Sequence, residues 1–430
     1  MRIAVLGAGS AGMIAAAHIR HALPEADLVQ IRDPSIPSIG VGEGTNPRFS
    51  EWLAAVTGLG LGDLEANCHA TLKIGTRFEG WGRQGAPFLN RFQPSHRFGF
   101  HLDATQLAVL LGRWGAAAQR TAHVITLRRH AAGVEVLLSG QESLEVDYVF
   151  DARGFPARRN EDLEGKDTSI PIAWIPTNSA RLYRLTPARP SIVTRAVARA
   201  HGWIFCIPLL GWTSCGYIYN DRLSSEQEVD DDFQEFVQSE SIEACEYRGG
   251  RSFPNHISSQ VFDGRIFQVG NAAGFIEPLE ATAISTAIVQ VRKACAWIRA
   301  WLDGERPGEA EIKAYNSSVI SASIRDSLFL AWHYACGSAW QTPFWQQARL
   351  CYLQSQFMAR VSADWHLMQR FIDAGRHANA VMLSQELSPS QWQASVFPQM
   401  KLYQPFGTFS ELNFAQVGHG IGFYDSMDEK

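Results

Sequence analysis

The stretch RIAVLGAGSAGMIAAAHIRH, residues 2–21, lies at the start of the chain and decides the expected fold. It combines a short apolar run at 2–6, a glycine-rich turn at 7–12 and a segment rich in small residues at 13–21. The pattern predicts a strand, a turn and a helix in this order, which is the context that a dinucleotide-binding fingerprint requires. We therefore expect the turn to bind a nucleotide.

Each glycine of this turn has its own expected role. Gly7 permits the tight turn, Gly9 lets the backbone approach a pyrophosphate, and Gly12 lets the helix pack closely on the strand. Ser10 and Ala11 belong to the same turn. The N-terminus of the helix would face the phosphate charge, because its amide groups and its dipole favour anions there.

The end of the second predicted strand, residues 28–31, is where an acidic residue should bind the ribose. Arg32 and then Asp33 follow this strand, and Asp33 lies 33 − 12 = 21 residues after Gly12. Asp33 is therefore the expected ribose ligand. Arg32 occupies the position where this acid usually lies, so it is left open which of the two positions faces the ribose.

Composition limits the class of protein. The 430 residues are 46% apolar and 19% charged, which is typical of a globular chain of two or three units. The charge sum of 38 − 43 = −5 provides no positive field for nucleic acid or anionic lipid. The seven cysteines have no zinc-like or dithiol spacing, so we expect reduced thiols and no metal site. We expect a cytoplasmic protein, because no 18-residue apolar run exists and the first strand leaves no room for a signal peptide.

Hydrophobic patterning predicts the remaining elements. They are a loop at 35–47, a helix at 48–56, a helix at 107–119, strands at 134–136, 146–150 and 265–269, a mixed β region at 170–219 and an acidic helix at 225–240. From residue 71 to residue 78 apolar and polar side chains alternate, which predicts one strand with Lys73 on its polar face. Beyond Thr282 we expect mainly helix.

Three segments, near residues 7, 151 and 270, each end a predicted strand with glycine and small or polar residues. One Rossmann unit does not supply three such ends. The pattern fits a flavin folded against a sheet, with its adenine end at the first segment and its isoalloxazine near the last. Asp151, Gly270 and Asn271 are therefore candidate cofactor residues.

Three further segments carry a family resemblance. Residues 40–47, GVGEGTNP, resemble the flavin strap of flavin-dependent halogenases of the tryptophan halogenase type. Residues 275–284, FIEPLEATAI, resemble the flavin- and halide-side segment of that family, and Lys73 in LKIGTRF matches its catalytic lysine. The resemblance covers about residues 1–350.

The resemblance implies an α/β fold: a Rossmann-like FAD-binding domain of the glutathione-reductase and hydroxylase type, with an interleaved β-sheet and a mainly helical C-terminal region. The expected domains are an FAD-binding module at 1–310, with interleaved mixed β-sheet at about 155–265, and a helical substrate-side cap at 311–430. The flavin-binding positions implied by the fingerprint and the resemblance are Gly7, Gly9, Ser10, Ala11, Gly12, Asp33, Gly40, Val41, Gly42, Glu43, Gly44, Thr45, Asp151, Gly270, Asn271, Pro278, Leu279 and Ile284.

The resemblance also implies an activity. Reduced FAD from a separate flavin reductase, O₂ and chloride or bromide would give hypohalous acid, which a tunnel passes to Lys73 beside an electron-rich aromatic such as an indole or a phenol. Lys73 would hydrogen-bond and polarise the oxidant, and Glu280 would orient it or take the ring proton. Backbone amides of Thr282 and Ala283 would hold the halide.

Several positions depart from the family pattern. Phe205 replaces the second tryptophan of a Trp-x-Trp-x-Ile-Pro segment, Ala281 replaces a common serine, and Ala283 often corresponds to glycine. Substrate identity therefore does not carry over, although substrate-lining residues are expected from 92–101 and from the tail after Thr342, which contains Trp345, Trp365 and Trp392. An aromatic hydroxylase that reduces its own flavin with a nicotinamide, and a non-catalytic flavin-binding protein, remain alternatives. A homodimer is left open.

Overall fold

The computed structural model describes residues 1–36, 40–93, 96–115, 118–155, 169–302, 307–361, 411–423 and 425. The chain forms two compact units. Unit 1 comprises Met1–Ala70, Leu102–Pro171 and Pro254–Ser323, and unit 2 comprises Thr71–His101, Ile172–Phe253 and Ile324–Lys430. Because each unit combines three separate stretches, this division differs from the expected boundary at residue 310, and the expected domains stay a prediction.

Unit 1 is built on a five-stranded parallel sheet. In spatial order its strands are β20 (Ile266–Gln268), β12 (Tyr148–Asp151), β1 (Arg2–Leu6), β2 (Asp27–Arg32) and β8 (Ala118–Thr121). The carboxyl ends of parallel strands meet at one edge of the sheet, so the segments that follow β1, β2, β12 and β20 are brought to the same edge.

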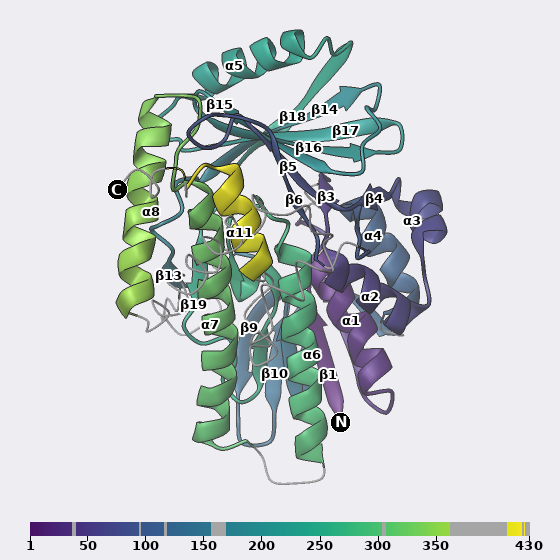
Figure 1. The fold of residues 1–430 in the computed structure, drawn as a ribbon. Coiled ribbons are helices and arrows are strands. Elements are labelled where there is room, and N and C mark those ends of the chain that lie inside the picture. The colour runs from purple at the N-terminus through teal and green to yellow at the C-terminus, as the bar shows by residue number, and fades with distance from the viewer. Residues whose placement is uncertain are drawn as a thin grey trace. The chain divides into compact units, whose positions relative to one another are not determined.

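Both faces of this sheet are covered, which explains why β1 is a continuous apolar run. Ile3 and Val5 pack with helices α1 (Ser10–Ala22) and α6 (Ala283–Leu302), which run side by side along one face (Figure 1). Residues of the other face of β1, such as Leu6, pack against an antiparallel meander. The meander consists of β9 (Val124–Arg129), β10 (Val134–Leu138) and β11 (Ser143–Val146).

The remaining described elements of unit 1 are short. They are β3 (Gly42–Gly44), α2 (Pro47–Thr57), α3 (Leu61–Cys68), α4 (Ala104–Leu111), two 3₁₀ turns (Gly112–Trp114 and Gly270–Ala272), β13 (Ser169–Pro171), β19 (His256–Ser258) and β21 (Gly274–Phe275). Helix α7 (Glu309–His333) begins in unit 1 and ends in unit 2.

Unit 2 contains a seven-stranded sheet. Its spatial order is β18 (Ala244–Ser252), β14 (Ser179–Thr186), β17 (Trp212–Tyr219), β16 (Gly202–Leu209), β15 (Thr194–Arg199), β5 (Gly75–Glu79) and β6 (Phe88–Arg91). Helix α5 (Glu226–Ser239) covers one face, where Phe233 packs on the ring of Tyr183. The other described elements are β4 (Thr71–Lys73), β7 (Gly99–Asp103), α8 (Pro343–Val361) and α11 (Glu411–Gly420).

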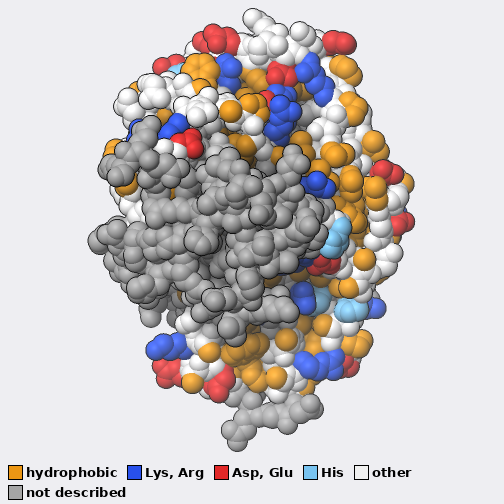
Figure 2. Space-filling view, viewed as in Figure 1, with side chains coloured by type: hydrophobic (Ala, Val, Ile, Leu, Met, Phe, Trp, Pro, Cys, Tyr) orange, Lys and Arg blue, Asp and Glu red, His pale blue; other side chains and the backbone are white. Residues whose placement is uncertain are grey.

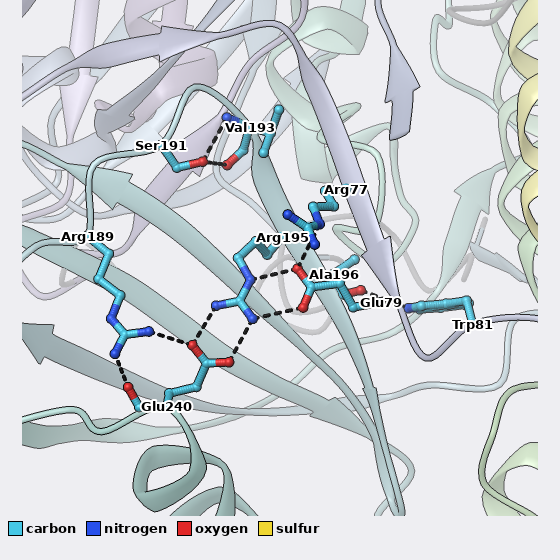
Figure 3. A network of polar contacts seen from close by, with 9 residues as sticks. All are labelled: Arg77, Glu79, Trp81, Arg189, Ser191, Val193, Arg195, Ala196 and Glu240. Atoms are coloured by element: carbon cyan, nitrogen blue, oxygen red, sulfur yellow. Dashed lines mark hydrogen bonds and ion pairs between the residues drawn. The ribbon is translucent and has the colours of Figure 1, made fainter. Parts of the chain in front are cut away.

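An ion-pair network fixes β5 beside β15 (Figure 3). The guanidinium of Arg195 donates two hydrogen bonds of 2.8 Å to Glu79 and also pairs with Glu240, which follows α5. Hydrogen bonding to Arg195 lowers the pKa of Glu240, although burial opposes this shift. Trp81 adds a bond of 3.0 Å from its indole nitrogen to the Ala196 carbonyl. The network therefore anchors the segment that directly follows Lys73.

Two sequence predictions near the sheet of unit 1 are wrong in detail. The helix expected at 107–119 ends at Leu111 and a 3₁₀ turn follows, while Ala118 begins the edge strand β8. The strand expected at 146–150 is interrupted at Asp147, whose carboxylate accepts a hydrogen bond of 2.7 Å from the backbone of Arg2. In both places contacts with a distant strand override local propensity.

Two further differences lie near the expected site. The loop predicted at 35–47 contains the short strand β3. The strand predicted from residue 71 to residue 78 is two strands, because Ile74 bonds through its backbone to Ile192 and Phe92 and separates β4 from β5. The alternation therefore shifts, and Lys73 is buried rather than on a solvated face.

Charged side chains of both signs are interspersed on the face of the molecule shown in Figure 2. Among the residues that the structure describes, none of the helices combines the length and the apolar character that a bilayer crossing requires.

Candidate active site

In the glycine turn between β1 and α1, one glycine has free space where a side chain would lie, and two glycines have backbone atoms there. A Cβ at Gly7, whose φ is +108°, would lie 2.5 Å from the carbonyl oxygen of Ala152, and a Cβ at Gly12 would lie 2.3 Å from that of Gly7. A Cβ at Gly9, the N-cap of α1, would meet no atom within 4 Å. Free space beside a helix N-terminus fits a pyrophosphate, so this turn can hold a dinucleotide such as FAD.

Asp33 lies directly after β2, at the expected ribose position. Its carboxylate accepts hydrogen bonds from the backbone and hydroxyl of Ser35, at 2.9 and 2.7 Å, and from Nδ1 of His123 at 2.8 Å. Burial alone would raise the pKa of Asp33, but these hydrogen bonds outweigh it and lower the pKa. Asp33 is thus held ionised and oriented, and His123 is a neighbour that sequence reasoning did not identify.

The ends of β12 and β20 approach the same glycine turn. Gly270, with φ +62°, would place a Cβ 2.6 Å from that of Ala11, and its backbone N–H donates to Gln290 of α6 at 2.8 Å. Asp151 is buried, and its carboxylate accepts three hydrogen bonds of 3.0 to 3.1 Å from Arg153. Sequence reasoning missed Arg153, whose guanidinium pairs with Asp151 at this edge; its place two residues after Asp151 is the available signal.

The strap, residues 40–45, lies against the start of α4. The carbonyl of Val41 accepts a hydrogen bond of 3.3 Å from the backbone of Ala104. Desolvation, helped by the negative charge of Asp103, raises the pKa of Glu43 to about 7. Glu43 therefore exchanges a proton near neutral pH, which its place in the sequence did not indicate.

The segment at 275–284 leads from β21 into the first turn of α6. Glu280 is 4% exposed, and Ala281 adopts a left-handed conformation with φ +54°. A non-glycine residue in this region carries backbone strain of about 1 kcal/mol or more. Thr282 accepts through its carbonyl from Thr286, so Thr282 and Ala283 lie at the N-terminus of α6, where helix amides favour an anion.

Lys73 ends β4 in unit 2, and it is 1% exposed. Its Nζ lies 5.7 Å from the centre of the Phe92 ring. Strand β4 pairs antiparallel with β7, with Thr71 opposite His101 and Lys73 opposite Gly99. Deep burial of a lysine is rare for a purely structural residue, because desolvation penalises the charge.

A buried hydrogen-bond chain lies beside Lys73. The hydroxyl of Thr71 donates to the carbonyl of Pro208 at 2.7 Å, so its oxygen accepts from Nδ1 of His101 at 3.0 Å. Nε2 of His101 lies 3.0 Å from the hydroxyl of Thr194 and accepts from it. Burial, and secondly the charge of Lys73, lowers the pKa of His101 well below its usual value. His101 is therefore a neutral link between four strands that sequence reasoning did not identify.

Phe205, which departs from the family pattern, and Trp345, an expected substrate-lining residue, are both packed in the structure. Phe205 is 7% exposed, and its ring lies over Gly216, where a Cβ would meet it at 2.3 Å. Trp345 is 2% exposed and its indole donates to the carbonyl of Arg199 at 2.8 Å, which suits a core residue. Trp365 and Trp392 lie outside the described residues.

The predicted site residues are divided between the units. All predicted flavin and halide positions, together with Glu280, belong to unit 1, and Lys73 belongs to unit 2. Within unit 1 direct contacts link the separate segments: Gly7 with Ala152, Gly270 with Ala11, and Ser285 with Asn46. The structure thus assembles the cofactor positions, and their individual roles stay proposals.

A parallel sheet that brings a dinucleotide turn, a strap and a helix N-terminus to one side defines an FAD-binding α/β enzyme fold. Residues 2–97 and 92–399 match the family model described as "Tryptophan halogenase". The chain belongs to the tryptophan halogenase family, and it is a flavin-dependent halogenase, an oxidoreductase that halogenates aromatic compounds. The hydroxylase and the non-catalytic alternatives are not favoured.

Relatives and solved structures agree with this assignment. The chain is 25% identical to the 7-chloro-L-tryptophan 6-halogenase KtzR of Kutzneria sp. (strain 744), over 80% of this chain and 81% of the relative. The structure of Xcc4156, a flavin-dependent halogenase from Xanthomonas campestris, has a TM-score of 0.74 at 19% identity and covers 98% of this chain and 88% of its own. That of the tryptophan 6-halogenase SttH from Streptomyces toxytricini has a TM-score of 0.70 at 21% identity, over 81% of both chains. The predicted fold class is confirmed.

Proposed function

We propose that the protein chlorinates or brominates an electron-rich aromatic, such as an indole or a phenol, with Lys73 and Glu280 as catalytic residues. The observation that carries the proposal is the burial of Lys73, at 1% exposure, in the segment that matches the family's lysine motif. A cation kept in such an environment is suited to bind a small polar oxidant that water would otherwise surround.

FAD would be held by the residues of unit 1. The open space at Gly9 suits the pyrophosphate, Asp33 suits the ribose, and the strap at 40–45 suits the ring system. When bound and reduced, the flavin would activate O₂, which would supply the oxidising equivalents that convert halide into hypohalous acid. The amides of Thr282 and Ala283 would hold the halide before this step, because they lie at the N-terminus of α6.

The remaining chemistry belongs to side chains. The Lys73 ammonium donates a hydrogen bond to the oxygen of hypohalous acid, which polarises the O–halogen bond. An aromatic carbon then forms its bond to the halogen as the O–halogen bond breaks, and the departing oxygen takes a proton from the Lys73 ammonium and leaves as water. The Glu280 carboxylate takes the ring proton, so that ArH and HOX give ArX and H₂O.

A separate flavin reductase would supply reduced FAD, and a cytoplasmic location remains our expectation. For the substrate, only the chemical class of the aromatic ring is proposed. Phe205 keeps an apolar wall where the family often has an indole donor. We therefore expect free tryptophan to be a poorer substrate than simple indoles, phenols or a bulkier conjugate.

The test combines purified protein, chemically reduced FAD, O₂ and bromide with a panel of aromatics that includes free tryptophan. Mass spectrometry should find products in which one bromine replaces one hydrogen. Hydroxylated products, or oxidation of NADPH by the protein without a reductase, would instead support a hydroxylase. Tight binding and single-position halogenation of free tryptophan would overturn the substrate proposal.

A further inference from the structure

Asn46 caps helix α2 directly after the strap, and it is 5% exposed. Its Oδ1 accepts a hydrogen bond of 3.1 Å from the backbone N–H of Arg48. The same oxygen accepts one of 2.5 Å from the hydroxyl of Ser285, in the first turn of α6. A backbone N–H can only donate, so the orientation of the side-chain amide is fixed by the cap.

This orientation leaves a buried donor without a partner. Nδ2 of Asn46 has no hydrogen-bond partner among the residues that the structure describes. A buried unpaired amide costs about 1–3 kcal/mol in general, so an unpaired donor at a cofactor segment indicates a missing acceptor. Neither the strap motif nor the segment at 275–284 assigns a role to the side chain at position 46.

Asn46 contacts the first turn of α6 through its side chain. Asn46 is tied through Ser285 to the helix whose N-terminus carries Thr282 and Ala283, and α6 is 20 residues long. We propose that Nδ2 of Asn46 is a side-chain donor to the halide bound at the N-terminus of α6. A halide offers no donor and takes several N–H contacts, and therefore suits a group of amides. The inference rests on the proposed halogenase function.

One substitution isolates the donor. Asn46→Asp keeps the size of the side chain, the cap to Arg48 and the acceptor for Ser285, and it replaces only the NH₂ group by a carboxylate oxygen. Asn46→Ser keeps a capping oxygen and removes the donor without adding charge. Asn67→Asp adds the same charge at a partly exposed position of α3 and serves as the control.

Halide binding is measured without turnover, as the line width of ³⁵Cl in chloride titrations and by competition with bromide, on protein loaded with oxidised FAD. FAD affinity and melting temperature are measured on the same samples. We expect Asn46→Asp to weaken chloride and bromide binding by about tenfold or more, because a charge-assisted hydrogen bond is lost and a repulsion is added. Asn46→Ser should show a smaller loss, and Asn67→Asp none.

The outcomes distinguish a failure of the proposed role of Asn46 from a failure of the proposed halogenase function. Halide affinity equal to wild type in a folded Asn46→Asp protein overturns the inference. Loss of FAD affinity with unchanged halide affinity also overturns it, because Nδ2 then binds the flavin. Wild-type protein that binds no halide contradicts the proposed function itself, whereas brominated product with a variant-independent halide affinity contradicts only the role of Asn46.

Discussion

The flavin side of unit 1 and the Lys73 region of unit 2 are built in different ways. In unit 1 the backbone forms most of the expected flavin and halide positions. Three glycines, a left-handed Ala281 and the N-termini of two helices shape them. Around Lys73 the environment is formed by side chains instead. They are joined by the hydrogen-bond chain that runs from Thr194 through His101 to the carbonyl of Pro208. A backbone-built site is therefore expected to fail through steric change, and a side-chain-built site through loss of one functional group.

Lys73→Met tests most directly whether the Lys73 region depends on a single functional group. The substitution keeps much of the length and removes the ammonium, so halogenated product should fall by about 10³-fold while FAD binding and reduced-flavin oxidation stay near wild type. Lys73→Arg should fail as well, because a planar fork does not replace a compact ammonium at a buried position. Product yield, flavin oxidation and melting temperature are compared on the same samples.

Arg77→Ala is the matched control, since Arg77 is an exposed cation on the next strand and pairs with Glu79. It should leave product formation unchanged. A folded Lys73→Met protein that halogenates at the wild-type rate would refute the mechanism.

Two glycine substitutions test whether the flavin side of unit 1 depends on the shape of its backbone. In Gly9→Asn the new side chain caps α1 and occupies the open space, so FAD affinity should fall by about 10²-fold while the fold keeps its stability. Gly12→Ala should instead destabilise the fold by about 2 kcal/mol, because its Cβ would collide with the Gly7 carbonyl. Flavin fluorescence and urea denaturation measure the two effects. Equal loss of stability in both variants would remove the distinction between the two glycines.

Glu280→Gln tests the carboxylate to which the proposal assigns the ring proton. The amide keeps the size but neither takes a proton nor carries charge, so product formation should fall by about 10²-fold. Flavin binding should change little, because the pyrophosphate and strap positions are untouched. If product falls only in proportion to the amount of folded protein, then Glu280 has a structural role at the start of α6.

The same contrast explains what the sequence could predict. Gly7, Gly9 and Gly12 lie within six residues of the chain, so a local pattern contains nearly the whole of that turn. The same pattern predicts β1, α1 and β2 to within two or three residues at their ends. The burial of Lys73 depends on β7 and on the backbone break at Ile74, which no local alternation contains. His101 shows no signal in sequence, because its partners are 30 and 93 residues away.

His101 provides a pH test of the Lys73 region. Its pKa is lowered in the folded chain, so below about pH 6.5 the unfolded chain binds the proton more readily, and stability falls as pH decreases. His101→Gln keeps one donor and one acceptor for the threonines and should lose part of this pH dependence. His101→Leu removes the acceptor of the buried Thr194 hydroxyl and the bond to Thr71, and it should cost about 2 kcal/mol at pH 7.

The measurement is urea denaturation at several pH values between 5 and 8. His18, whose pKa burial lowers to about 4, adds a dependence of the same sign in unit 1 and is present in all variants. A His101→Gln protein with the wild-type pH slope would show that His101 is not the neutral link described here.

The smallest expected effect lies in the backbone of the flavin side. Ala281 has φ +54°, a region that glycine adopts without steric cost, whereas Ala283 starts a regular helix. Ala281→Gly should therefore stabilise the protein by up to about 1 kcal/mol, after the higher entropy of glycine in the unfolded chain is counted. Ala283→Gly is the matched control and should destabilise it by about 0.5–1 kcal/mol, because glycine weakens a helix. Opposite signs in urea denaturation would locate the strain at Ala281, between Glu280 and the proposed halide amides. Destabilisation by both substitutions would mean that the loop gains more from the alanine methyl group than it loses in backbone strain, and the flavin side would then rely on side-chain packing as the Lys73 region does.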